Sequence, residues 1–176
     1  MSDDLRYPIG EFQFPERVGD SERESSIQAI ADTPERLYEA VSGLEESQLD
    51  TPYRPGGWTI RQVVHHLPDS HLNSYVRFKL AVTENEPTVK TYDEAVWAEL
   101  DDARNGDVAD SLKLLESLHG RWVRFLRSLG PNELARTFQH PELGTVSVAE
   151  NIALYAWHGR HHVAHINAAR QREGWT

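Results

Sequence analysis

The sequence contains no cysteine, and this absence removes several classes of site. Without a thiol, the chain of 176 residues cannot form disulfides, thiolate metal sites or a cysteine nucleophile. Any metal site must therefore use imidazole, carboxylate or water as ligands. Any thiol that takes part in its chemistry must come from a substrate.

Long apolar runs are absent as well. No stretch approaches the roughly 18 to 20 apolar residues that a membrane-spanning helix needs. The first residues, Met1 to Asp4, include acids where a secretory signal carries positive charge. We therefore expect a cytoplasmic protein that does not enter a membrane.

Basic residues are too few for a nucleic-acid surface. The chain has 18 Lys plus Arg against 28 Asp plus Glu, a formal net charge of −10. Nucleic-acid-binding proteins neutralise phosphates with clusters of basic residues, so we expect no such partner. A hydrophobic fraction of 39% suffices for a core, and the length predicts a single domain over residues 1–176.

Four long segments repeat apolar residues at helical spacing. The first is expected to begin at Ser21, which has the spacing of a capping box with Glu24, and to end near Gly43. Pro34 lies inside it and predicts a kink or a short break near Thr33.

The other long helices carry similar signals. The second is expected to follow Thr59, the third to span about 109–129, and the fourth to run from about 148 to 172 after the cap residue Ser147. A short helix is predicted near 93–100, and an irregular loop or small hairpin over 136–146. These elements predict an all-α four-helix bundle with a possible hairpin before the last helix.

The first 19 residues are predicted to form an extended arm. Pro8 and Pro15 prevent a helix there. Tyr7, Phe12 and Phe14 favour docking of the arm on the bundle, because disordered tails are usually poor in aromatic residues.

Seven of the nine histidines fall in the second and fourth predicted helices: His65, His66, His71, His158, His161, His162 and His165. Neutral imidazole is the commonest metal ligand, and two histidines four residues apart share one helical face. At about 100° per residue, His158 and His162 lie nearest the apolar face of the fourth helix and His161 lies at its rim. The pattern predicts His158 and His162 as a chelating pair, with a third ligand from another helix.

The second helix leaves that third ligand open. His71 falls near the centre of the apolar stripe, whereas His66 falls on a polar stripe with Ser70, Asn73 and Arg77. Hydrogen-bonded core histidines, a pH-sensing cluster and an adventitious metal site are alternatives to a resident metal. Trp58 and Trp157 are near the candidate ligands in sequence and could wall a pocket.

Two motifs carry a resemblance to a known family: GGWTIRQVVHHLPDSH at 56–71 and YAWHGRHHVAH at 155–165. They closely resemble the DinB-like superfamily and, within it, the YfiT-type metal-dependent hydrolases, which are also described as bacillithiol S-transferases. Segments 7–10, 49–54, 73–79 and 118–122 are similar to the same subgroup. The resemblance extends over nearly the whole chain.

The resemblance implies a homodimeric four-helix bundle that binds one divalent ion per chain, zinc or nickel. By motif position the metal ligands are His66, His158 and His162, and the choice of His66 rests on the resemblance alone. Pro68 departs from the family pattern, which has an ordinary helix former there, and this departure bears on the ligand geometry.

The main functional hypothesis is a metal-dependent enzyme acting on small electrophilic substrates. Its reaction would be hydrolysis or the transfer of a low-molecular-weight thiol, and the sequence identifies no catalytic acid or base. The alternatives are a non-catalytic module or sensor that binds a metal or small ligand, and a helical dimer whose histidines serve only packing.

Overall fold

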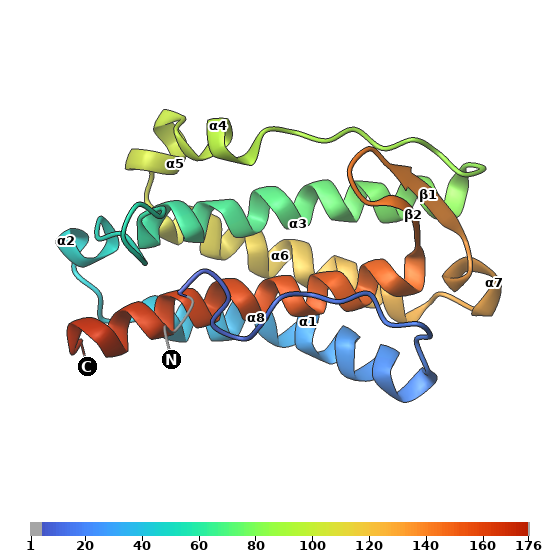
Figure 1. Ribbon diagram of the computed structural model, residues 1–176, viewed down its shortest axis with the longest axis horizontal. Helices are drawn as coiled ribbons and strands as arrows, with labels where there is room; N and C mark the ends of the chain where they lie inside the picture. Colours follow the sequence, from blue (N-terminus) through green and yellow to red (C-terminus); the bar gives the residue numbers. More distant parts are fainter. Residues whose placement is uncertain (1–4, 176) are drawn as a thin grey trace.

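Four long helices form the body of the computed structural model, which describes residues 5–175 (Figure 1). They are α1 (Asp20–Val41), α3 (Ile60–Thr83), α6 (Val108–Arg127) and α8 (Val148–Glu173). This architecture confirms the predicted all-α bundle. None of the helices within the described residues combines the length and apolarity that a membrane span requires.

Shorter elements connect the long helices. They are α2 (Glu46–Leu49), α4 (Glu94–Ala98), α5 (Asp101–Asn105), α7 (Pro131–Leu134) and the strands β1 (Thr137–His140) and β2 (Gly144–Ser147). The strands pair antiparallel, with Phe138 opposite Val146. The predicted hairpin before the last helix is therefore present, and α4 lies within the short helix predicted near 93–100, whereas α2, α5 and α7 are additional.

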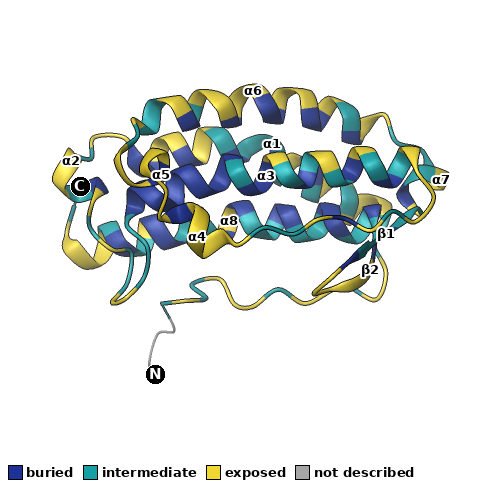
Figure 2. Cartoon of the chain, turned by 90° about the horizontal axis from the view of Figure 1, so that it is seen from above, coloured by how far each residue is buried: buried dark blue, intermediate teal, exposed yellow. Residues whose placement is uncertain are grey.

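The packing order of the helices is not that of an up-and-down bundle. α1 packs against α8 and α6, and α3 packs against the same two helices. The consecutive helices α1 and α3 therefore lie diagonally opposite each other, as do α6 and α8. Figure 2 shows the buried faces of the four helices turned toward their common axis.

Two of the predicted helix caps are present. Thr59 caps α3 with Gln62 as the reciprocal residue, and Ser147 caps α8 in the same way with Glu150. Both boxes satisfy backbone N–H groups that have no partner inside the helix. The caps therefore anchor the N-terminal ends of the two helices that carry most of the histidines.

One expectation for the first helix is wrong, and of the kink or short break predicted near Thr33 the break is absent. α1 begins one residue earlier than predicted, because the Glu22 carboxylate accepts a hydrogen bond from the Gly19 N–H at 3.0 Å and replaces the expected pair of Ser21 and Glu24. The helix also continues through Pro34 without a break. Pro34 has no N–H to donate to the carbonyl oxygen of Ile30. This oxygen instead lies 2.6 Å from Nδ1 of a histidine on α6.

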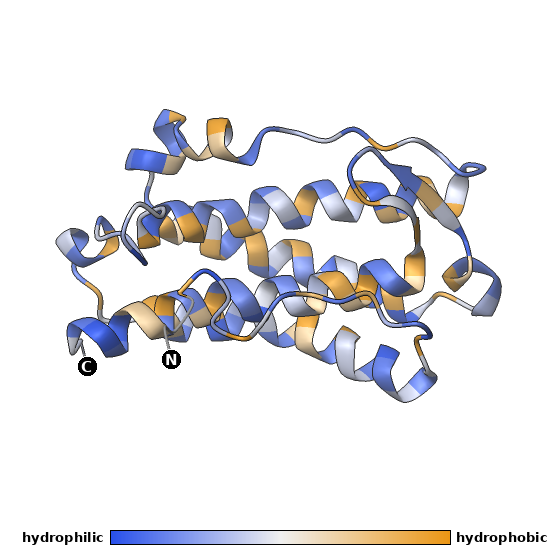
Figure 3. Ribbon diagram, viewed as in Figure 1, coloured by the Kyte–Doolittle hydropathy of each residue, from blue (hydrophilic) through white to orange (hydrophobic). Residues whose placement is uncertain are grey.

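The core consists of two apolar clusters arranged along the bundle. One contains Trp122, Phe78 and Ile152, and the other contains Leu67, Ile166 and their neighbours. Trp122 is fully buried, as expected for a core residue. Figure 3 shows apolar and polar residues alternating along all four helices, as the amphipathic pattern predicts.

The N-terminal arm runs along α8 (Figure 1). Trp157 Nε1 donates a hydrogen bond to the carbonyl of Gly10 at 3.2 Å, and His165 Nε2 lies 2.9 Å from the carbonyl of Arg6. The Phe12 ring also contacts Trp157, with 5.8 Å between centroids. The predicted arm thus contacts α8 over its described part, while residues 1–4 lie outside the described residues.

Close approach of α1 and α8 depends on Gly159. A Cβ atom at this position would lie 2.6 Å from Thr33 Oγ1. We expect Gly159→Ala to lower the free energy of unfolding by about 1–3 kcal/mol, the usual cost of overpacking. Denaturant unfolding measures this change, and Thr33→Ala should recover part of it in the double variant.

Gly120→Ala is the matched control, because nothing lies within 4 Å of a Cβ atom at this position on α6. Here alanine should raise the free energy of unfolding by up to about 1 kcal/mol through helix propensity. Equal effects of the two substitutions would show that the α1–α8 contact does not need glycine.

Candidate metal centre

Three histidines from two helices converge inside the bundle. One nitrogen from each of His66, His158 and His162 lies within 4.8 Å of the other two. His66 Nε2 is 3.3 Å from His158 Nε2, and the His162 ring centroid lies 4.8 Å from that of His66 and 4.5 Å from that of His158. The structure therefore brings together the histidine triad (His66, His158 and His162) that the sequence and the resemblance predict.

Local structure sets the position of each member of the triad. The spacing of four residues places His158 and His162 on one face of α8. The capped start of α3 lies less than two turns before His66, and the Trp58 ring contacts the His66 ring with 4.9 Å between centroids. Trp58 thus lies beside a candidate ligand, as the sequence suggested.

Burial keeps the triad neutral at pH 7. It lowers the pKa of His66 to about 4. It also lowers the pKa values of His158 and His162 well below the usual range, with smaller contributions from the neighbouring imidazoles. A neutral imidazole has a free lone pair on one nitrogen, so this donor set fits a divalent zinc or nickel ion.

The hydroxyl of Ser70 lies beside the triad and next to a second hydroxyl, that of Tyr155. Ser70 Oγ is 3.5 Å from His158 Nε2 and 3.4 Å from Tyr155 Oη. Within residues 5–175, the group of converging donors contains these three histidines and no carboxylate. Three protein ligands leave coordination positions for water or substrate, which is the arrangement of catalytic rather than structural zinc sites.

The other two histidines of α8 have different neighbours. His161 stacks on Trp157 with 4.3 Å between centroids, and His165 stacks on Tyr53 with 4.1 Å. The expectation that His161 lies at the rim is wrong, since only 6% of it is exposed. Trp157 on the same helix and Tyr7 of the arm both contact it, and the helical wheel could not include the contact with the arm.

His119 is the residue at this centre that the sequence reasoning missed. It lies on α6, is 2% exposed, and its Nε2 is 2.7 Å from Nδ1 of His71. Its only sequence signal is its place in the 118–122 segment that resembles the family. A lone histidine on an amphipathic helix otherwise predicts nothing specific.

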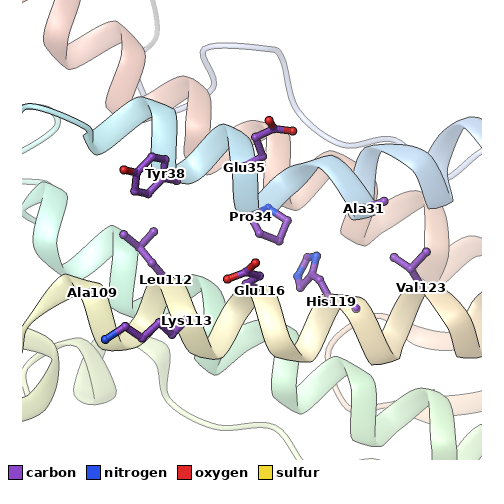
Figure 4. Close-up of a pocket in the computed structure, with 11 residues that line it drawn as sticks. Ala31, Pro34, Glu35, Tyr38, Ala109, Leu112, Lys113, Glu116, His119 and Val123 are labelled. Atoms are coloured by element: carbon purple, nitrogen blue, oxygen red, sulfur yellow. The ribbon is translucent and has the colours of Figure 1, made fainter.

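A separate groove of about 740 Å³ lies between α1 and α6 (Figure 4). Its lining includes the apolar or aromatic side chains of Tyr38, Leu112 and Val123 and the carboxylates of Glu35 and Glu116. The triad does not line it. His119 does, so this side chain lies between the groove and the histidines of α3 and α8.

Comparisons with known proteins now place the chain in a family. A model described as the DinB superfamily matches residues 29–166. The chain belongs to the DinB superfamily. This assignment confirms the resemblance on which the choice of His66 rested.

Relatives of this DinB-superfamily chain have similar names. It is 55% identical over 172 residues to a "putative metal-dependent hydrolase" of Bacillus mycoides, covering 98% of this chain and 99% of the relative. A protein of the same name from Bacillus anthracis is 54% identical over the same lengths. The relatives therefore match the chain from end to end.

A solved structure matches just as completely. YfiT from Bacillus subtilis superimposes with a TM-score of 0.96 at 46% identity, covering 98% of this chain and 99% of that one. It is described as a probable metal-dependent hydrolase with an unusual four-helix bundle topology. The diagonal placement of α1 and α3 agrees with that description.

Metal analysis tests the triad. We expect the purified wild type to hold close to one divalent ion per chain, and the variant His158→Ala, His162→Ala to lose it, because one imidazole remains. His161→Ala is the matched control on the same helix and should keep the metal. Equal, substoichiometric metal in the wild type and the double variant would contradict the site.

Asp69, one turn after His66 on α3, provides a pH-dependent prediction. Burial raises its pKa to about 6, with a smaller contribution from the charge of Asp102 on α5. Ionising Asp69 therefore costs the folded state free energy that the unfolded state does not lose. This cost is absent near pH 3, grows as the pH rises from about 4 to about 6, and is constant above that.

Asp69→Asn should remove this cost. We expect the wild type to lose stability relative to the variant as the pH rises through that window, measured as the difference between their free energies of unfolding. A difference that does not change with pH would show that Asp69 titrates normally.

Proposed function

We propose that this chain is a metal-dependent enzyme that acts on small electrophilic substrates. One divalent ion, zinc or nickel, would be held by His66, His158 and His162. The observation that carries the proposal is the convergence of three neutral imidazole nitrogens without a carboxylate among the described residues. The names of the relatives support a metal-dependent hydrolase at the same coarse level.

The chain and the ion would have distinct tasks. When bound, a divalent ion of this kind lowers the pKa of a water or thiol at its open position, for zinc-bound water to about 7. The triad supplies neutral ligands from rigid helices, which keeps their geometry constant. The Ser70 hydroxyl lies where it can hydrogen-bond to a group beside His158 Nε2, and the Tyr155 hydroxyl lies next to Ser70.

Two nucleophiles are compatible with this centre. The relatives' names support water and therefore hydrolysis. The resemblance to bacillithiol S-transferases supports a low-molecular-weight thiol, which would have to be a substrate because the chain has no cysteine. In that reaction the thiol releases its proton to solvent, its sulfur forms a new S–C bond, and the leaving group departs from the electrophilic carbon with the electron pair of the bond that breaks.

An activity assay separates the two reactions. We would incubate the zinc- or nickel-loaded protein with a monobromobimane-type electrophile and several low-molecular-weight thiols, and separately with ester and amide substrates. The rate of the variant His158→Ala, His162→Ala should fall by more than the roughly 10- to 100-fold that removal of an outer-shell partner of a metal ligand costs. His161→Ala should retain the wild-type rate.

The outcomes discriminate among the hypotheses. The thiol-transfer hypothesis is wrong if no thiol accelerates loss of the electrophile. The hydrolysis hypothesis is wrong if no ester or amide is turned over. If stoichiometric metal is bound and neither reaction occurs with these substrates, the result favours a non-catalytic binding module. The homodimer implied by the resemblance stays a prediction, and light scattering of the purified protein measures it.

A further inference from the structure

Behind the triad, a line of hydrogen bonds crosses the whole bundle. His158 Nδ1 lies 3.0 Å from His71 Nε2, and His71 Nδ1 lies 2.7 Å from His119 Nε2. The line ends where His119 Nδ1 lies 2.6 Å from the carbonyl oxygen of Ile30. We call His158, His71 and His119 the histidine row; with Ile30, it takes one residue from each long helix.

Pro34 explains why the carbonyl of Ile30 is available. In an α-helix this carbonyl would accept a hydrogen bond from the N–H of residue 34, but proline has no N–H. The orphaned acceptor is inside the bundle, where His119 reaches it from α6. Figure 4 shows Pro34 and His119 facing each other across the space between α1 and α6.

The carbonyl sets the direction of every hydrogen bond in the row. A carbonyl oxygen only accepts, so His119 Nδ1 must donate to it. A neutral imidazole has one N–H and one acceptor nitrogen, so His119 Nε2 accepts from His71 Nδ1. By the same rule His71 Nε2 accepts from His158 Nδ1, which leaves the lone pair of His158 on Nε2.

That remaining nitrogen is the one that faces the triad. His158 Nε2 is 3.3 Å from His66 Nε2, on the opposite side of the ring from the row. The opposite tautomer would place a proton at this position and would leave two acceptor nitrogens facing each other between His158 and His71. The row therefore selects the tautomer that a metal ligand requires.

We propose that His71 and His119 are positioning residues of the metal centre, which fix the tautomer and ring orientation of His158 through the carbonyl that Pro34 leaves free. This inference rests on the metal binding proposed above. Metal-ligating histidines usually donate their second ring N–H to a carbonyl or carboxylate. Here the second ring N–H of His158 is donated to an imidazole, and two imidazoles link it to the carbonyl that finally accepts.

Zinc affinity of variants at His119 tests the row without relying on activity. Glutamine can donate its amide to the Ile30 carbonyl and accept at its oxygen from His71, so His119→Gln should bind zinc within about threefold of the wild type. Leucine can do neither, and His119→Leu should bind roughly 10- to 100-fold more weakly, as for other outer-shell partners. Competition with a chromogenic chelator measures both.

Leu115→Ala is the matched control for loss of stability. Leu115 is fully buried on α6, one turn before His119, and its side chain has no group that can hydrogen-bond to the row. Its variant should unfold more easily and keep the wild-type zinc affinity. If His119→Leu binds zinc as well as Leu115→Ala, the positioning role is wrong. If His119→Gln loses as much affinity as His119→Leu, the hydrogen-bond directions assigned to the row are wrong.

The wild type alone provides a second test, which does not depend on whether any variant folds. Two-bond ¹H–¹⁵N spectra of the metal-free protein should show His158, His71 and His119 protonated on Nδ1. A His158 protonated on Nε2 in a protein that binds zinc overturns the row and leaves the proposed function intact. A wild type that binds neither zinc nor nickel overturns both proposals.

Discussion

Buried imidazoles that must satisfy one another's hydrogen bonds are the constraint on which the rest of this structure depends. The histidine row lies between the two apolar clusters, since Leu67, Leu115 and Val163 belong to one and Phe78, Trp122 and Ala156 belong to the other. A buried polar group without a partner costs roughly 1–3 kcal/mol. A shift of any long helix along its neighbours would break one of these hydrogen bonds. The row therefore holds the four helices in register.

The same burial connects the fold to its chemistry. Desolvation keeps the imidazoles of the row and the triad uncharged, and an uncharged imidazole is the form that binds a metal. Trp58 lies against the triad, and the N-terminal arm lies against the neighbouring residues of α8. Pro34 removes one hydrogen bond from α1 and so leaves free the carbonyl acceptor that sets the direction of the hydrogen bonds in the row.

Sequence reasoning succeeded where the physics is local. The capping boxes of α3 and α8 and the shared face of His158 and His162 follow from residues three or four positions apart. It failed where distant segments intervene. Of the kink or break predicted near Thr33, the break does not occur, and a residue of α6 satisfies the carbonyl that Pro34 frees. His161 is buried by contacts that include the arm, which a wheel of one helix cannot contain.

By itself, the sequence determined the four amphipathic helices, the imidazole character of any metal site and the pair on α8, because helical geometry places residues of known spacing on known faces. Resemblance to a family added His66. Only the tertiary structure decided that α1 and α3 lie on a diagonal and that His71 and His119 stand behind His158. The contacts that decide these points join residues dozens of positions apart, and packing alone brings such residues together.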